Sequence, residues 1–264
     1  MSQTLREDLL GQILADPDDL SLRKKWARAW EPDDPDFSTF LRLDLDLARA
    51  TRGVPPPLDF SSYDAERHGL RLERDRLLRS GVRERLLGPR PHPLLDPIVQ
   101  DGFIAGGRVS AENLLRAPEG VFGRYPVRHL VVSDPKPHME RLARLPWLAQ
   151  IRTLALRRCR LEDADLTALL GSEHLSGLKM IDLRDNALTK SAAVALARTP
   201  RLPNLQVVLI GGNPCPTLEV DLWVDQGYVI GETESSLAIE LRSRFGARAW
   251  LEPAHTLLTD PTYF

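Results

Sequence analysis

Three segments of the chain align without gaps: residues 151–161 (IRTLALRRCRL), 178–188 (LKMIDLRDNAL) and 205–215 (LQVVLIGGNPC). Their first residues are 27 positions apart, and each segment has apolar residues at positions one, four and six. These apolar residues are Ile151, Leu154, Leu156, Leu178, Ile181, Leu183, Leu205, Val208 and Ile210. Position nine is Cys159, Asn186 or Asn213. A fixed period of about 20–50 residues is typical of stacked units that share one core.

Two weaker units precede these three. Residues 127–132 (VRHLVV) match positions one, four and six, with Pro135 at position nine, and residues 102–109 (GFIAGGRV) have the pattern of a capping strand. Helical patterns lie between the strand patterns, at residues 139–148, 162–172 and 190–200. Strands that alternate with helices predict an α/β fold with a parallel sheet.

The pattern LxxLxLxxN/CxL resembles the leucine-rich repeat, and the long helices resemble its ribonuclease-inhibitor style. This resemblance implies a short solenoid with parallel strands on a concave face and helices on a convex face. An amide at position nine can bond the backbone groups that the turn leaves unpaired, and a buried thiol can do so more weakly. We therefore expect Cys159, Asn186 and Asn213 to form a structural turn ladder.

The flanking sequence predicts four regions. Residues 1–52 form a helical module, in which Asp19 or Ser21 caps the second helix and LRLDLDL (41–47) is helix rather than the alternative strand. Residues 53–100 are a linker and a long charged helix over 64–87. Residues 101–216 hold the repeats with their N-terminal cap strand, and residues 217–264 form a C-terminal α/β cap of two strands and a helix.

Two stretches of the N-terminal module resemble the "repeat-companion" domain found beside bacterial leucine-rich repeats. Phe40-Leu41-Arg42-Leu43 matches one stretch of that domain well. Trp26-Ala27-Arg28-Ala29-Trp30 matches the other poorly, with Arg28 where that domain usually has Asp. The resemblance implies a bacterial protein, a fold and a style of binding, and it transfers no activity.

Composition and motifs exclude several classes of function. The formal net charge is −2, which provides no global basic field for nucleic acid. Two cysteines and no long apolar run predict a cytoplasmic protein without a disulfide framework or a membrane association. The usual nucleotide, hydrolase and zinc motifs are missing, so we expect no catalytic residue, no metal and no cofactor. A catalytic role for Cys159 is the weaker alternative to a core position in its repeat.

Positions three, five and seven of each repeat should face solvent on the concave side. The candidate partner-binding residues there are His129, Val131, Thr153, Arg157, Met180, Asp182, Arg184, Val207 and Leu209. Arg157 and Arg184 lie on neighbouring strands and could jointly hold an acidic group, or Asp182 could neutralise them. The alternative is an ordinary solvated sheet face.

These features predict a non-catalytic protein-interaction module that binds a partner protein through the concave face. The alternative is a regulatory or accessory subunit of a bacterial enzyme, signalling or defence system. An enzyme in its own right would need a cleft with perturbed titratable groups.

Overall fold

The computed structural model describes residues 3–51, 65–88, 92–216, 221–225, 228–233 and 235–251. The fold is α/β. Strands β1 to β6 form one six-stranded sheet in chain order, and β7 and β8 pair separately. The chain divides into two compact units, Met1–Gly107 with Pro118–Val127 and Arg108–Ala117 with Arg128–Phe264. In the described part of the chain no helix is long and apolar enough to cross a membrane.

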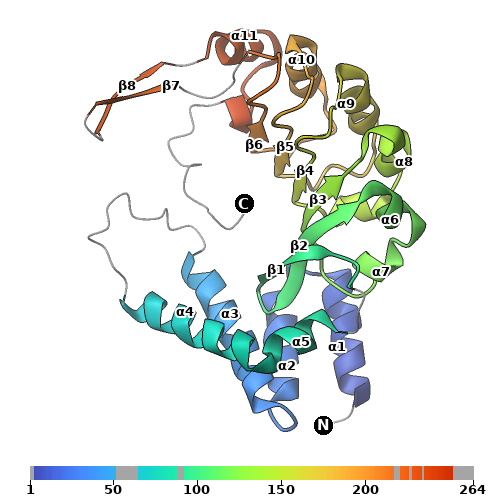
Figure 1. Ribbon diagram of the computed structural model, residues 1–264, viewed down its shortest axis with the longest axis vertical. Helices are drawn as coiled ribbons and strands as arrows, with labels where there is room; N and C mark the ends of the chain where they lie inside the picture. Colours follow the sequence, from blue (N-terminus) through green and yellow to red (C-terminus); the bar gives the residue numbers. More distant parts are fainter. Residues whose placement is uncertain are drawn as a thin grey trace. The chain divides into compact units, whose positions relative to one another are not determined.

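The first unit is mainly helical (Figure 1). Its elements are α1 (Gln3–Ala15), α2 (Leu20–Trp30), α3 (Pro35–Thr51), α4 (Ala65–Leu77), a π-helical turn (Leu78–Val82), α5 (Arg83–Leu87), β1 (Leu95–Gln100), β2 (Phe103–Ser110, whose last three residues belong to the second unit) and α7 (Glu119–Phe122). The three predicted N-terminal helices are confirmed, and the Asp19 carboxylate accepts from Ser21 N and Leu22 N as the N-cap of α2.

Helix α3 settles the ambiguous stretch LRLDLDL as helix. Phe37, Phe40, Leu41, Asp44 and Leu45 are buried, and their i, i+3, i+4, i+7, i+8 spacing is that of one helix face. The core of this unit joins Trp26, Phe37 and Phe40 to Phe103 of β2, among other apolar side chains. Aromatic packing therefore links the helical module to a strand that follows it by more than fifty residues.

The predicted helix over residues 64–87 is divided by Gly81. This glycine has a φ of 103°, which no helix residue adopts, so α4 and α5 are separate helices with a π-helical turn between them.

A hairpin of β1 and β2 was not predicted from the sequence, which placed residues 95–100 in a linker and helix region. Its turn residues Asp101 and Gly102 have φ values of 53° and 79°, as in the tight Asp-Gly turns that match strand twist. The buried Asp44 accepts from Gly102 N at 2.6 Å and from Arg74 Nε at 2.5 Å. Burial raises the pKa of Asp44, and the Arg74 charge opposes that shift.

The second unit contains the repeated segments. Its elements are α6 (Ala111–Arg116), β3 (His129–Ser133), a 3-10 turn (Lys136–His138), α8 (Met139–Ala143), a 3-10 turn (Pro146–Gln150), β4 (Thr153–Ala155), α9 (Asp163–Leu170), β5 (Met180–Asp182), α10 (Lys190–Arg198), β6 (Val207–Leu209), β7 (Asp221–Asp225), β8 (Tyr228–Thr233), α11 (Ser236–Phe245) and a 3-10 turn (Ala249–Leu251). The two strands and the helix predicted after residue 217 correspond to β7, β8 and α11.

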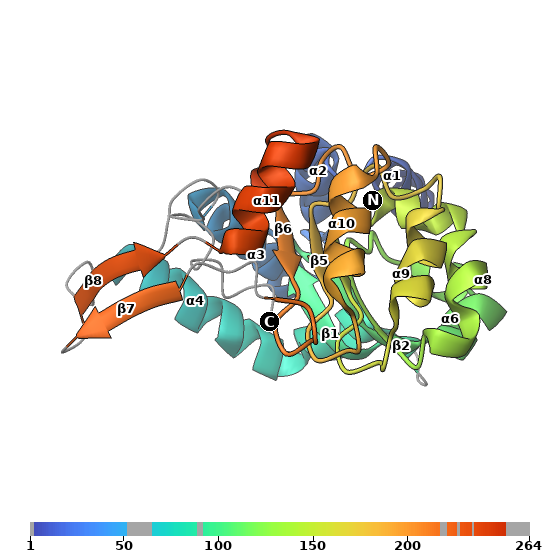
Figure 2. The same ribbon diagram turned by 90° about the horizontal axis from the view of Figure 1, so that it is seen from above.

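Strands β3 to β6 are parallel and in one register. His129 pairs with Thr153, Thr153 with Met180, and Met180 with Val207. Helices α8, α9, α10 and α11 stand in a row along one side of these strands (Figures 1 and 2). All nine apolar residues at positions one, four and six of the three strong repeats are at most 7% exposed. The period of the sequence therefore identified the core of this unit.

Candidate functional site

Seven of the nine predicted partner-binding residues lie in two lateral rows across β3 to β6, and Ala155 completes the second row. One row is His129, Thr153, Met180 and Val207, and the other is Val131, Ala155, Asp182 and Leu209. Val131, Val207 and Leu209 are half-buried, and Arg157, beyond the end of β4, is exposed. These four residues offer surface to a partner.

Four of the predicted residues offer little surface. His129, Thr153, Met180 and Asp182 are 8%, 7%, 8% and 4% exposed, whereas their positions in the repeat predict that they face solvent. Thr153 and Met180 each have an in-register neighbour on both sides, and strands about 4.8 Å apart let such long rows shield their members. The guanidinium group of Arg184 covers Asp182. The alternation of residues within a strand predicts the face of the sheet to which a side chain points. It does not predict how much neighbouring side chains bury it.

Asp182 and Arg184 form a pair within the face. The Asp182 carboxylate accepts from Arg184 Nη2 at 2.8 Å, from Arg184 Nε at 3.0 Å and from Arg184 N at 3.1 Å. This geometry realises the alternative in which Asp182 neutralises its neighbour. Arg184 is therefore engaged, and Arg157 is the arginine of the two that faces solvent without an acidic partner among the described residues.

The residues of the turn ladder connect consecutive repeats. Asn186 Nδ2 donates to Leu156 O and Leu183 O, while its Oδ1 accepts from Cys159 N at 2.9 Å and Leu161 N at 3.1 Å. Asn213 repeats this set one unit later. Its Nδ2 donates to Leu183 O and Ile210 O, and its Oδ1 accepts from Asn186 N and Leu188 N. Each amide thus satisfies both donors and acceptors of the backbone.

The Cys159 sulfur contacts backbone carbonyl groups, whereas the two asparagines also accept from backbone N–H groups. Its Sγ lies 3.2 Å from Arg157 O and 3.6 Å from Val132 O, within donor distance of both carbonyls. The two positions whose N–H groups an asparagine would accept from in the preceding repeat are Pro135 and Pro137. Proline has no N–H, so a side chain that only donates is sufficient here.

Both cysteine thiols have raised pKa values. Burial, aided by the Asp134 charge, raises the pKa of Cys159 from 9.0 to about 11. Burial also raises the pKa of Cys215. A raised pKa keeps each thiol protonated near neutral pH, and the thiolate is the reactive form.

A second lateral contact escaped the sequence analysis. Arg128 Nη1 donates to Gln150 O at 2.7 Å, and Arg152 Nη1 donates to Gly177 O at 3.2 Å. Both arginines occupy position two of their repeats, and both acceptors immediately precede position one of the next repeat. A Cβ on Gly177 would lie 2.2 Å from Arg152 Nη1, so only glycine leaves room for this side chain. The recurrence of arginine at position two is the signal that could have revealed the contact.

Position eight of every repeat has a left-handed backbone. Its φ is 51° at Asp134, 59° at Arg158, 58° at Asp185 and 71° at Gly212. Arg160, at position ten, is left-handed as well, with a φ of 56°. This conformation costs a residue with a Cβ about 1–2 kcal/mol, and arginine lacks the short polar side chain that helps Asn and Asp adopt it.

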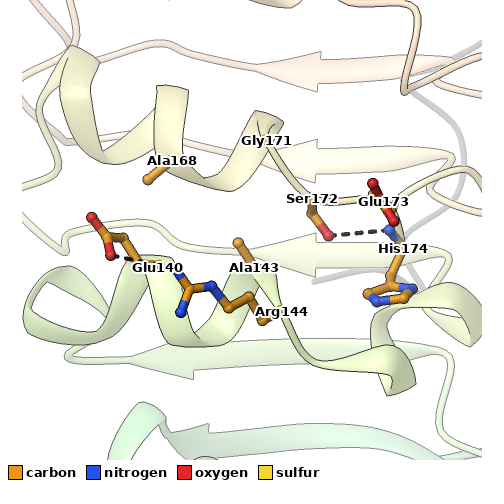
Figure 3. Close-up of a pocket in the computed structure, with 8 residues that line it drawn as sticks. All are labelled: Glu140, Ala143, Arg144, Ala168, Gly171, Ser172, Glu173 and His174. Atoms are coloured by element: carbon orange, nitrogen blue, oxygen red, sulfur yellow. Dashed lines mark hydrogen bonds and ion pairs between the residues drawn. The ribbon is translucent and has the colours of Figure 1, made fainter.

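A cleft of about 460 Å³ lies between α8 and α9, lined by Glu140, Ala143, Arg144, Ala168, Gly171, Ser172, Glu173 and His174 (Figure 3). Glu140 and Arg144 are about 80% exposed and pair at 3.9 Å. The buried Ser172 Oγ accepts from His174 N at 3.1 Å. The lining therefore combines one exposed ion pair, Glu140 with Arg144, and one buried hydroxyl group, that of Ser172.

Within the described residues no group of three or more His, Cys, Asp or Glu side chains could hold a metal ion. A scan against models of protein families gives no match, and neither does a search of curated proteins.

Proposed function

We propose that this chain is a leucine-rich-repeat solenoid that serves as a non-catalytic protein-interaction module and binds a partner protein on the concave face of its strands. The observation that carries the proposal is the common register of β3 to β6. It sets Val131, Ala155 and Leu209 in one row, all half-buried, on a face that also exposes Arg157. Apolar area beside an arginine is the composition that protein interfaces favour.

The repeat architecture is supported by the turn ladder. The same hydrogen bonds recur 27 residues apart at Asn186 and Asn213, and helices follow β3, β4 and β5. Units that contact mainly their neighbours through such repeated bonds are characteristic of solenoids. The helices stand along one side of the strands, and Val131, Ala155 and Leu209 on the other side keep part of their surface exposed.

Two further properties favour a protein partner in the cytoplasm. The net charge of −2 gives no long-range attraction for nucleic acid. Cys159 and Cys215 are free thiols, which suits a reducing compartment.

The test is substitution at the centre of the face. Ala155→Arg places a long charged side chain in the row between Val131 and Asp182, and Ala195→Arg makes the same change at a half-buried position of α10. With the full chain as bait in its native host, we expect Ala155→Arg to reduce capture of a specific partner by about tenfold or more and Ala195→Arg to leave it unchanged.

Equal capture by both variants would refute the concave-face proposal. The activity of the captured partner, measured with and without the chain, separates a simple binding module from the alternative of a regulatory subunit.

A further inference from the structure

Positive charge is concentrated on one of the four aligned turns. Positions seven to ten of the repeats read Ser-Asp-Pro-Lys at 133–136, Arg-Arg-Cys-Arg at 157–160, Arg-Asp-Asn-Ala at 184–187 and Gly-Gly-Asn-Pro at 211–214. Three of these turns have no net formal charge, and the turn at 157–160 carries three arginines among four residues. The repeat itself requires no net positive charge at these positions, because the other three turns have none.

Most of the surrounding cations are already paired. Lys136 contacts Glu162 at 2.5 Å, Arg158 contacts Asp185 at 3.1 Å, and Arg184 contacts Asp182. Arg157 and Arg160 are exposed and have no acidic partner among the residues that the structure describes. Two uncompensated guanidinium groups therefore lie on one turn, whose first and fourth Cα atoms can be at most about 11 Å apart.

The backbone of this turn is held in place by the next repeat. Arg158 N donates to Arg184 O at 3.1 Å, and Asn186 Oδ1 accepts from Cys159 N and Leu161 N on either side of Arg160. These bonds hold Arg158 and Arg160 in left-handed conformations that arginine disfavours. A fixed backbone lowers the entropy that the turn loses when it binds a ligand.

We propose that the turn Arg157–Arg160 binds an acidic polypeptide segment of the partner, with Arg157 and Arg160 each holding a carboxylate; the inference rests on the proposed function. A guanidinium group matches a carboxylate in a bidentate fork, and consecutive acidic side chains can span one turn. Nucleic acid is disfavoured as the ligand, because its affinity comes from many phosphate contacts and this patch offers two unpaired cations on an acidic protein.

The experiment measures binding of a fluorescein-labelled oligoglutamate peptide to the full chain by fluorescence anisotropy, at low and at physiological salt. The variant is Arg157→Gln with Arg160→Gln. The matched control is Arg198→Gln with Arg201→Gln, which removes two exposed arginines at and beyond the end of α10. We expect the first variant to bind about tenfold more weakly or worse, and the control to bind within about twofold of the wild type.

Two further ligands serve as controls. Oligoglutamine of equal length tests whether binding requires the carboxylates, and a single-stranded oligonucleotide of equal charge tests whether any polyanion binds. The proposal is overturned if oligoglutamate does not bind, if it binds both variants equally, or if the oligonucleotide binds more tightly through the same arginines. A partner whose capture depends on Ala155 but not on Arg157 and Arg160 would leave the proposed function intact and refute the acidic-segment inference alone.

Discussion

The turns at Cys159 and at Asn186 share a left-handed residue at position eight and differ in side-chain chemistry, and at position ten Arg160 has a positive φ whereas Ala187 does not. Position eight is left-handed in both, with φ of 59° at Arg158 and 58° at Asp185. Asn186 donates and accepts, whereas Cys159 contacts carbonyl oxygens through its sulfur. The preceding repeat explains the difference, because it offers Asn186 two N–H groups and offers Cys159 two prolines, Pro135 and Pro137. The residue at position nine is thus selected by the backbone of its neighbour.

Exchanging the residue types at position nine, with Asn186→Cys and Cys159→Asn as separate variants, is expected to change stability the most. Asn186→Cys leaves the N–H groups of Cys159 and Leu161 without their acceptor, so we expect the free energy of unfolding to fall by about 3 kcal/mol in urea titrations. Cys159→Asn gains a stronger donor but leaves its Oδ1 facing prolines, so we expect a change within about 1 kcal/mol.

The control for this exchange is Asn204→Ala. The exposed Asn204 makes one side-chain bond, to Ser176 O at 2.8 Å, and its loss should cost less than about 1 kcal/mol. Equal losses for Asn186→Cys and Cys159→Asn would contradict our explanation of the two turns.

The contrast between the Cys159 and Asn186 turns requires that Cys159 be protonated, since a thiol can donate a hydrogen bond and a thiolate cannot. The raised pKa of about 11, against 9.0 for a free thiol, means that the thiolate forms only at higher pH in the folded protein. We expect alkylation by iodoacetamide at pH 8, followed by mass spectrometry of the Cys159 peptide, to be about 100-fold slower in the folded chain than in urea. The rate should still be rising above pH 9, and a plateau near pH 9 would contradict the assignment.

Relief of backbone strain is expected to give the smallest effect. Arg160→Gly places the residue that best tolerates a positive φ at a position with φ of 56°. The gain in the folded state exceeds the entropy that glycine adds to the unfolded state, so we expect about 0.5 kcal/mol of added stability in the same titrations. Oligoglutamate binding should weaken in this variant. A loss of stability would mean that the Arg160 side chain supports the fold.

The sequence predicted the core of the repeats because apolar period and backbone register have the same physical origin. Position four, at Leu154, Ile181 and Val208, is at most 7% exposed, and the three residues pair in register. The helix of residues 35–51 was also predicted, since no turn residue interrupts it. These features depend on short-range spacing.

Other features escaped prediction because they depend on contacts between distant residues. The hairpin turn at Asp101 and Gly102 is supported by Asp44 from α3, and no local pattern in residues 95–100 indicates a strand beside a proline. His129, Thr153 and Met180 were expected to face solvent and are buried.

By itself, the sequence determined the repeat, its 27-residue period, its buried positions and the residues at position nine, because each is a matter of spacing along one chain. Only the tertiary structure decided which charges are neutralised. Asp182 pairs with Arg184, two residues further along the chain, and Asp185 pairs with Arg158 from the neighbouring repeat. Arg157 has no acidic partner among the described residues. Ion pairing depends on side-chain positions across strands, and the order of residues does not fix those positions.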